Sequence, residues 1–293
     1  MAAPLIRKLA VFGVGLIGGS FALALKKAGA VGEVVGVGRG LSNLGDAYRL
    51  GIIDEAVTKP AEAVAGADMV LLAVPVGQMP VVMAAIAPHL SPDTVVTDAG
   101  STKQDVLAYA RNHLANHLSR FVPAHPIAGA EKTGAAAASA ELYQGRNVVV
   151  TPLAENDAAA VAKVKEAWAA CGAVVREMAP QSHDEVFAAV SHLPHLLAFA
   201  LVDDIAGKPN AEELFSYAAS GFRDFTRIAG SSPEMWRDIS LANREALLKE
   251  LDAYRAQLER LRAALEAGDG AVLEQIFTRA SRARNAWAGG EKQ

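Results

Sequence analysis

The sequence predicts an α/β fold: a doubly wound, mostly parallel sheet, followed by an all-α domain. Up to about residue 180, short apolar runs alternate with helical stretches, and from Gln181 onward every periodic segment is helical. Alternating strands and helices are typical of an open sheet that is covered on both faces. The 293 residues suffice for two domains. We therefore expect one domain over residues 1–180 and a second, helical domain over residues 181–293.

The first apolar run leads into a glycine-rich turn. Leu9–Phe12 is predicted to be a strand, Gly13-x-Gly15-x-x-Gly18 the turn, and Leu16–Ala28 the helix that follows it. In this pattern the first glycine allows a sharp turn, the second lets a pyrophosphate approach the backbone, and the third lets helix and strand pack closely. The N-terminus of the helix offers free N–H groups and the positive end of its dipole to phosphate. The pattern predicts a Rossmann-type, dinucleotide-binding domain.

The same stretch permits a second interpretation. Leu9–Leu25 is uncharged and follows Arg7 and Lys8, as in a signal peptide or a membrane span. The glycines, however, crowd at its front, where a strand would turn, and Lys26 and Lys27 follow at once. We therefore expect no membrane insertion.

The composition is typical of a soluble globular protein, with 52% hydrophobic and 20% charged residues. A formal net charge of −4 gives no general attraction to nucleic acid or to an anionic membrane. The single cysteine, Cys171, excludes an internal disulfide and a cysteine-built metal site. We expect a cytoplasmic enzyme that acts on a small molecule and has no metal centre.

The predicted second strand, residues 33–38, ends at Arg39. An acidic residue at this point would accept hydrogen bonds from the adenosine ribose, whereas an arginine can neutralise a 2′-phosphate. The sequence therefore favours NADP over NAD as the cofactor. A solvated Arg39, with the ribose bound by backbone or by Ser42, is the alternative.

Further apolar runs predict the remaining strands, at residues 68–75, 94–98, 121–125, 147–152 and 173–178. The first of these runs is continuous, as expected for a parallel strand covered on both faces, and Pro75 ends it before a helix predicted over residues 76–89. Ser101 or Thr102 is placed to cap the helix that begins near Lys103. The residues assigned to cofactor binding are Gly13, Gly15, Leu16, Ile17, Gly18, Arg39, Val74 and Pro75.

Ligands bind at the carboxyl ends of the strands in open α/β sheets, so polar residues that follow strands are candidates for the site. His125 ends a predicted strand and opens a loop rich in small residues. An imidazole is a natural acceptor for an alcohol proton during hydride removal. A buried structural histidine is the alternative interpretation.

Two segments of the helical domain carry further candidates. Residues 191–195, Ser-His-Leu-Pro-His, place two histidines beside a proline that should kink the helix. Arg223 and Arg227 lie four residues apart among aromatic and serine residues, and a guanidinium pairs with a carboxylate in a planar fork. This indicates a possible anion site, with ordinary surface ion pairs as the alternative.

The last part of the chain contains a heptad-like apolar seam. Its members, spaced alternately by four and three residues, are Leu247, Leu251, Tyr254, Leu258, Leu261 and Leu265. Such a seam faces another helix, either of the same subunit or of a second one. Its length favours a homodimer through the C-terminal helices.

Together these segments resemble the prephenate/arogenate (cyclohexadienyl) dehydrogenase family of tyrosine biosynthesis, over nearly the whole chain. The resemblance is carried by GVGLIGGS at 13–20, DAGSTK at 98–103, HPIAG at 125–129, SHLPH at 191–195 and the segment 221–236. It implies an NAD(P)-dependent oxidative decarboxylation of prephenate, arogenate or both, which yields 4-hydroxyphenylpyruvate or tyrosine. Arg39 stands where NAD-using members have an acidic residue, and in this it resembles NADP-using members.

The resemblance also implies residue roles. His125 would accept the proton of the ring hydroxyl, and Ser101 would hydrogen-bond His125 or that hydroxyl. Arg227 would hold a substrate carboxylate. The other residues expected to line the substrate pocket are Arg223, His195, Ser231, Trp236 and, near its mouth, Glu131. The C-terminal helices would form a dimer across which the pockets are completed.

Two other functions stay open at this point. One is another two-domain NADP-linked dehydrogenase of the β-hydroxyacid type, or an imine reductase. Such enzymes usually rely on a lysine in the helical domain, where only Lys208 and Lys249 precede the extreme tail. The other is a non-catalytic NADP-sensing protein, which would need neither the histidine nor the arginine.

Overall fold

The computed structural model describes residues 3–38, 40–129 and 133–290. It divides into two compact units, residues 1–244 and 245–293. Residue 180, where the sequence places the domain boundary, begins a helix inside the first unit. The first unit thus holds both the sheets and the helices that follow them.

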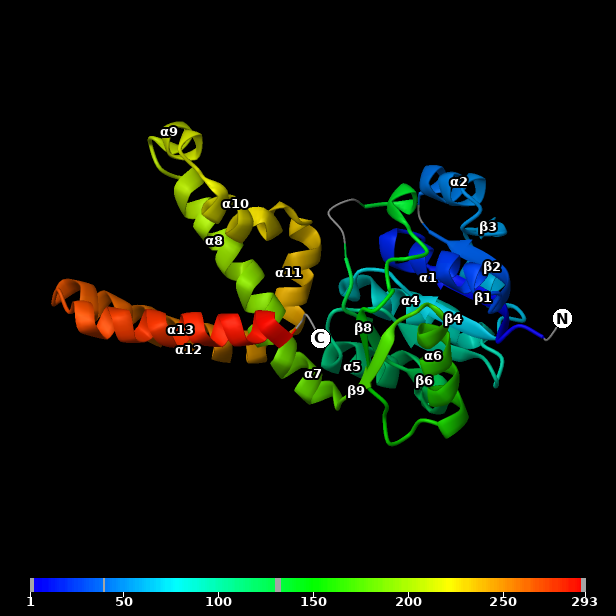
Figure 1. Ribbon diagram of the computed structural model, residues 1–293. Coiled ribbons are helices and arrows are strands. Elements are labelled where there is room, and N and C mark those ends of the chain that lie inside the picture. The colour runs from blue at the N-terminus through cyan, green and yellow to red at the C-terminus, as the bar shows by residue number, and fades with distance from the viewer. Residues whose placement is uncertain (1–2, 39, 130–132, 291–293) are drawn as a thin grey trace. The chain divides into compact units, whose positions relative to one another are not determined.

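Six parallel strands form the main sheet, in the order β3-β2-β1-β4-β5-β6 (Figure 1). They are β1 (Ile6–Phe12), β2 (Val31–Val37), β3 (Glu55–Val57), β4 (Met69–Leu72), β5 (Val95–Asp98) and β6 (Phe121–Val122). The predicted Rossmann-type sheet is therefore confirmed. The edge strand β3 is an addition to the prediction, because three residues are too few to give a periodic signal.

Helices cover the main sheet on both faces. They are α1 (Leu16–Lys27), α2 (Leu41–Arg49), α3 (Pro60–Val64), α4 (Met79–Ile86), α5 (Gln104–His113) and α6 (Ala158–Ala170). The helix predicted over residues 76–89 is α4 flanked by two 3-10 turns, Val76–Gln78 and Ala87–His89. The strands are apolar without interruption because both of their faces are covered.

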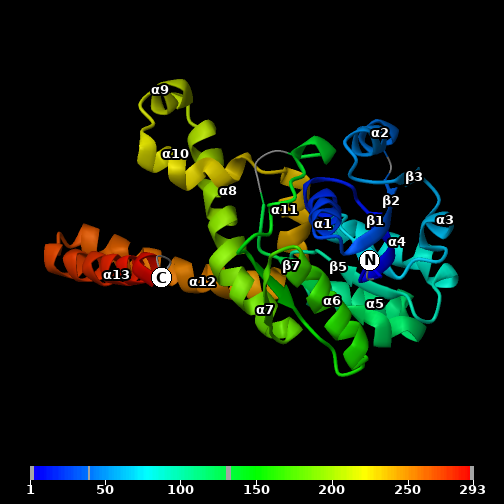
Figure 2. The same cartoon turned by 45° about the vertical axis from the view of Figure 1, so that its right-hand side comes forward.

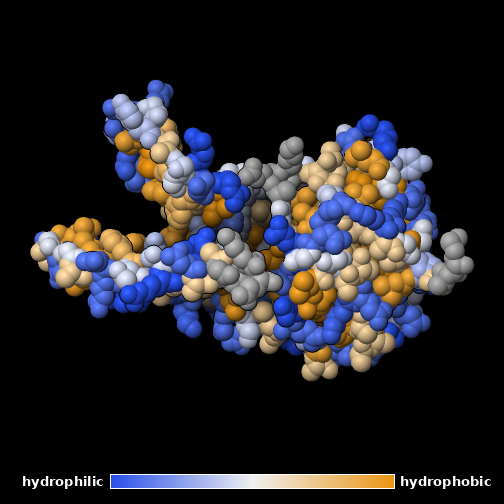
Figure 3. All heavy atoms as spheres, viewed as in Figure 1, coloured by the Kyte–Doolittle hydropathy of each residue, from blue (hydrophilic) through white to orange (hydrophobic). Residues whose placement is uncertain are grey.

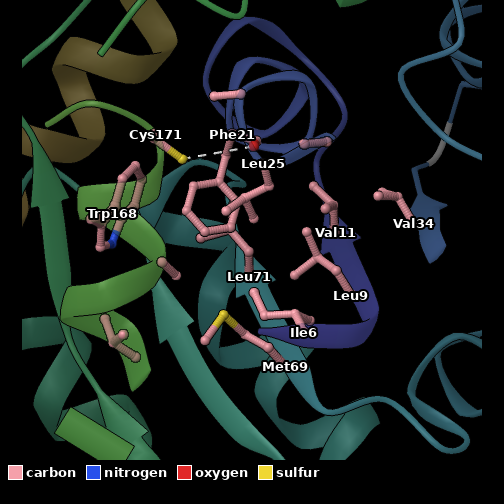
Figure 4. Packing of buried hydrophobic residues seen from close by; sticks show 14 of the residues in the cluster. Ile6, Leu9, Val11, Phe21, Leu25, Val34, Met69, Leu71, Trp168 and Cys171 are labelled. Carbon is pink, nitrogen blue, oxygen red and sulfur yellow. Dashed lines mark hydrogen bonds between the residues drawn. The ribbon is translucent and has the colours of Figure 1, made fainter. Parts of the chain in front are cut away.

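Strand β1 shows how successive residues serve the two cores. Leu9 and Val11 pack into the core beneath α1 and α6, whereas Ala10 and Phe12 pack into the core formed with α4 and α5. Figure 4 shows the first core, in which the rings of Phe21 and Trp168 lie 4.5 Å apart by their centroids. The stretch 9–25 is thus β1, the glycine turn and most of α1, all packed into the sheet domain rather than forming a membrane span.

A second sheet of three strands corrects the predicted layout. It has the order β7-β8-β9, from β7 (Ala124–Pro126), β8 (Asn147–Val150) and β9 (Val174–Glu177), and β7 runs antiparallel to β8. The expected single strand at 121–125 is divided between the two sheets at Pro123, which has no N–H with which to continue a ladder. The strands expected at 147–152 and 173–178 belong to this second sheet as well.

The helical part of the first unit begins with a continuous run. It comprises α7 (Pro180–Phe187), a π-helical turn (Ala188–His192) and α8 (Leu193–Ala206), followed by α9 (Ala211–Ser216), α10 (Ser220–Thr226), a 3-10 turn (Arg227–Gly230) and α11 (Pro233–Ala242). The π turn lies directly before Pro194, where the sequence predicts a kink. Among the described residues, only the 27-residue run Pro180–Ala206 is long and apolar enough by composition to cross a membrane.

The second unit contains two long helices, α12 (Arg244–Glu266) and α13 (Gly270–Gly290), which lie side by side in Figures 1 and 2. The predicted apolar seam lies on α12. Leu247 is buried, whereas Leu258 and Leu265 remain 45% and 67% exposed. The unit therefore leaves part of the seam uncovered.

Candidate active site

The glycine turn between β1 and α1 has the geometry that its sequence predicts. Gly13 has φ = 96°, and a Cβ there would lie 2.4 Å from the carbonyl oxygen of Ala73. A Cβ on Gly18 would lie 2.2 Å from the carbonyl oxygen of Gly13. Close approach of the backbones thus requires both glycines.

Gly15 differs from the other two glycines of the motif. It is the N-cap of α1, and a Cβ there would meet nothing within 4 Å. The N–H groups of the first helical turn, including those of Leu16, Ile17 and Gly18, have no partner within the helix. Open space before free N–H groups at a helix N-terminus fits a pyrophosphate.

Two more predicted cofactor residues lie beside this turn, and one cannot be placed. The backbone N of Val74 would be 3.1 Å from a Cβ on Gly13, and the exposed Pro75 follows. Arg39 lies outside the described residues. The residues present therefore fit a dinucleotide, and their direct contacts with it stay predictions.

Asn43 on α2 joins this turn to the loop that follows β7. Its Nδ2 donates to the carbonyl oxygen of Val14 (2.7 Å), and its Oδ1 accepts from the backbone N–H of Ala135 (2.9 Å). One amide side chain thus holds two segments that lie 121 positions apart in sequence (135 − 14). No local sequence pattern around Asn43 indicates this role.

His125 lies in the middle of β7, opposite Val149. The strand is tied to the end of β5, because the backbone N–H of Ala124 donates to Asp98 Oδ1 (3.1 Å). Asp98 also forms an ion pair with Lys103, and both side chains are completely buried. Ser101, half-buried, lies in the same turn; its predicted hydrogen bond to His125 or to substrate stays a prediction.

The imidazole of His125 contacts a second histidine that the sequence analysis did not select. His125 Nδ1 lies 2.8 Å from His183 Nε2, and the ring of Phe187 packs edge-on against His125 at 4.9 Å between centroids. Burial, together with the neighbouring His183 and Lys103, holds the pKa of His125 well below its usual value. His125 is therefore neutral at pH 7, the form that can accept a proton.

Asp184 is the next member of this cluster. His183 Nδ1 lies 2.8 Å from Asp184 Oδ1, and the carboxylate accepts the backbone N–H groups of Lys103 (2.8 Å) and Gln104 (2.9 Å). Burial alone would raise the pKa of Asp184, but these hydrogen bonds outweigh it and the pKa lies below the ordinary value.

Asp184 therefore caps α5, the role that the sequence analysis gave to Ser101 or Thr102. Neither of those side chains caps the helix. The prediction was wrong because the actual cap comes from a residue 81 positions away in the chain.

A second group of buried polar side chains adjoins the first. Asn243 Nδ2 donates to the carbonyl oxygen of Asp184 (2.8 Å) and to His192 Nδ1 (3.1 Å). Burial is the main cause that lowers the pKa of His192 to about 4. His192 in turn packs edge-on against Trp236, with ring centroids 6.1 Å apart.

Trp236 brings in the predicted substrate residue His195. The two rings stack at 3.6 Å between centroids with an angle of 20°, and His195 Nδ1 donates to the carbonyl oxygen of Ser191 (2.9 Å). Burial and the charge of Arg227 lower the pKa of His195, against the effect of its bond to Ser191. Arg227 thus acts electrostatically on the imidazole that Trp236 covers.

The structure brings some predicted residues together and leaves others apart. His125, Trp236 and His195 belong to one contiguous set of contacts through His183, Asp184, Asn243 and His192. Arg223 is exposed on α10, and Ser231 is half-buried just before α11. Glu131 lies outside the described residues. The substrate contacts of all these residues stay predictions.

The sequence contains a pattern that could have identified His183 and Asp184 as candidates. A neighbouring pair of titratable residues precedes Phe187 by one helical turn, on the face that the sheet domain covers. His183 is 0% and Asp184 1% exposed. Titratable groups buried so completely cluster at functional sites. The arrangement therefore holds a neutral base and a carboxylate near the carboxyl end of β5.

Comparisons with known proteins show the family of the chain. The family model described as "Prephenate dehydrogenase, nucleotide-binding domain" matches residues 21–177, and "Prephenate dehydrogenase, dimerization domain" matches residues 179–279. The cyclohexadienyl dehydrogenase of Zymomonas mobilis is 39% identical over 95% of both chains. The prephenate dehydrogenase of Bacillus subtilis is 37% identical over 90% of this chain and 72% of its own.

Solved structures give the same result. The prephenate dehydrogenase of A. aeolicus, in complex with hydroxyphenyl propionate and NAD+, has a TM-score of 0.88 and 36% identity, over 98% of this chain and 99% of its own. The arogenate dehydrogenase of Synechocystis has a TM-score of 0.80 and 28% identity, over 96% of this chain and all of its own (100%).

Proposed function

The chain belongs to the prephenate dehydrogenase family of NAD(P)-dependent oxidoreductases, and we propose that it converts prephenate to 4-hydroxyphenylpyruvate and carbon dioxide. The observation that carries this proposal is the contiguous set of buried contacts between His125 and the His195–Trp236 stack. It supports one site that contains His125 as the proposed base and His195 and Trp236 as proposed substrate-binding residues. We assign the enzyme to the cytoplasm.

His125 is the proposed general base. Its low pKa keeps the imidazole unprotonated at neutral pH, so it can accept the proton of the ring hydroxyl. When bound, the nicotinamide cofactor accepts the hydride from the ring carbon. Loss of the ring carboxylate as carbon dioxide then makes the ring aromatic. Ser101, in the turn after β5, is proposed to orient His125 or the hydroxyl.

The substrate carboxylate is proposed to bind Arg227. A guanidinium can bind a carboxylate through two parallel hydrogen bonds. His195, held against Trp236, lies close enough for its pKa to sense the charge of Arg227. We place Arg223, Ser231 and Glu131 around the same pocket, and we leave arogenate as a second substrate of this site.

For the cofactor, we propose NADP in preference to NAD. Arg39 follows β2, where its positive charge can neutralise the 2′-phosphate of NADP. Changing Arg39 to Asp should lower the NADP preference and raise the NAD preference. A wild type that already prefers NAD would overturn this part of the proposal.

We also propose a homodimer through the helical region. The run Pro180–Ala206 is apolar, yet only 28% of its most apolar window is buried. Helices α8, α9 and α10 line an apolar hollow of about 410 Å³, next to the exposed side chains of Phe215 and Tyr217. Figure 3 shows apolar residues on the visible face of this segment. A second copy would cover them, and the molar mass in solution tests this.

Initial rates with prephenate and with arogenate, each combined with NAD and with NADP, test the function directly. We expect turnover of prephenate, with release of carbon dioxide and reduction of the cofactor in equal amounts. Absence of turnover in all four combinations would refute the proposal. Activity on a β-hydroxyacid instead would favour the other class of two-domain dehydrogenase.

A further inference from the structure

Three side chains from β7 and α7 form a hydrogen-bonded series that ends at the N-terminus of α5. His125 Nδ1 lies 2.8 Å from His183 Nε2, and His183 Nδ1 lies 2.8 Å from Asp184 Oδ1. Asp184 accepts the backbone N–H groups of Lys103 and Gln104 at 2.8 and 2.9 Å. The series therefore has one end that is fixed by main-chain donors.

This fixed end determines where the protons lie. An ionised carboxylate only accepts hydrogen bonds, so His183 Nδ1 must carry a proton and donate it to Asp184. A neutral imidazole has one N–H, so His183 Nε2 accepts, and His125 Nδ1 must be the donor in that bond. The remaining nitrogen, His125 Nε2, then carries a free lone pair. That is the tautomer a base needs.

The charges around the two rings differ. Burial is the main cause that holds the pKa of His125 low, and His183, Lys103 and His192 each add to it because they disfavour a positive charge on the ring. Burial and Lys103 also disfavour a positive charge on His183 and keep its pKa below the ordinary value, but Asp184 and Asp98 act in the opposite direction. A positive charge is therefore better placed on His183 than on His125.

We propose that His183 and Asp184 are positioning residues that fix the Nδ1–H tautomer of His125 and take up the charge that His125 gains during turnover. This proposal rests on the proposed function of His125 as the base. As the substrate O–H bond breaks, a proton bonds to His125 Nε2. The Nδ1–H bond of His125 then breaks, and that proton bonds to His183 Nε2. The result is a neutral His125 and an imidazolium His183 beside the Asp184 carboxylate, while the hydride goes to the nicotinamide cofactor.

His183→Gln separates fixing the tautomer from taking up the charge. The Oε1 of glutamine can accept from His125 Nδ1–H, and its Nε2 can donate to Asp184, but an amide cannot hold the proton. We expect kcat to fall roughly tenfold, with the KM for prephenate unchanged and the acid limb of the pH profile moved to lower pH. His183→Leu, which removes both hydrogen bonds, should lower kcat roughly 10³-fold.

Asp184→Asn is expected to remove the negative charge and leave the direction of the series unchanged. Asp184 Oδ1 accepts from both His183 Nδ1 and the backbone N–H of Lys103, so the amide oxygen takes this position and the amide NH2 faces Gln104. A neutral amide cannot stabilise an imidazolium on His183, so kcat should fall roughly tenfold, as in His183→Gln. Glu185→Gln is the matched control, because it makes the same acid-to-amide change at an exposed position next in the chain.

The deciding measurement is the 15N spectrum of histidine-labelled enzyme, which distinguishes Nδ1–H from Nε2–H without any turnover. We expect Nδ1–H for His125 in the wild type, in His183→Gln and in Asp184→Asn. Nε2–H in the wild type overturns the proposal, and so does a wild-type kcat and pH profile for His183→Leu. If the tautomers are as expected but prephenate and arogenate are not turned over, the proposed function has failed and the tautomer assignment stands.

Discussion

The glycine turn and the histidine cluster (His125, His183, Asp184, His192 and Asn243) differ in how the chain builds them. The turn is local: it spans Gly13 to Gly18, and its close contacts are between backbone atoms. The cluster is assembled from distant side chains, since His125 and His183 are 58 residues apart and His192 and Asn243 are 51 apart. A substitution in the turn changes the volume that side-chain atoms occupy. A substitution in the cluster changes which nitrogen atoms carry protons.

The two regions therefore respond to different substitutions. The turn leaves open space beside Gly15 at the N-terminus of α1, and the proposed binding of a pyrophosphate requires that no side chain fills this space. In the cluster, burial lowers the pKa values of His125, His183 and His192 and keeps their imidazoles neutral at pH 7. The two regions can therefore be separated by variants that change either volume or protonation, but not both.

His125→Asn should give the largest effect on activity. It removes the base but keeps a side chain that can donate to His183, so kcat should fall about 10²–10⁴-fold, the usual contribution of a positioned base. The KM for prephenate should change little. Steady-state kinetics check this, with His113→Asn, an exposed histidine on α5, as the control. An unaltered kcat would remove His125 from the mechanism.

The pair Gly13→Ala and Gly15→Ala tests the volume argument in the turn. At Gly13 the positive φ and the overlap with Ala73 should cost about 2–5 kcal/mol of folding free energy. At Gly15 the methyl group meets nothing in the protein, so stability should hold, while the KM for the cofactor rises. Thermal unfolding and cofactor saturation distinguish them. Equal loss of stability in both variants would contradict the assigned open space.

The contrast also explains how much the sequence could predict. The turn, the parallel sheet and the helical region have local patterns, and the structure reproduces them. The division of residues 121–126 between two sheets depends on Pro123 and on pairing with β8, which lies 21 residues further on (147 − 126). The capping of α5 by Asp184 depends on a contact over 81 positions. Neither leaves a periodic signal, because each depends on tertiary packing.

Arg227→Ala tests whether the cluster continues into a binding surface for an anion. Loss of a charge-assisted hydrogen bond should weaken the binding of prephenate by about 1.5–3 kcal/mol, or about 10- to 150-fold in KM. Arg237→Ala removes the same charge from an exposed position on α11 and should leave KM unchanged. Identical saturation curves for Arg227→Ala and the wild type would place the carboxylate elsewhere.

His192→Gln should change the pH dependence of the free energy of unfolding and so test whether His192 is shielded from water. The pKa of His192 is about 4 in the folded protein, against 6.5 for the ordinary value. Between these values the unfolded chain binds a proton that the folded chain does not, so stability rises with pH. Lowering the pH from 6.5 to 5 should therefore cost the wild type about 1.6 kcal/mol through this residue.

In His192→Gln this part of the slope should vanish, whatever the variant's stability at pH 7. The other histidines of the site also have lowered pKa values, so the variant should keep a slope of the same sign that is smaller than the wild-type slope. Denaturant unfolding at several pH values measures the slope. His113→Gln, a substitution at an exposed position outside the cluster, is the control variant. A wild-type slope in His192→Gln would mean that water reaches His192 in the folded protein and that burial does not lower its pKa.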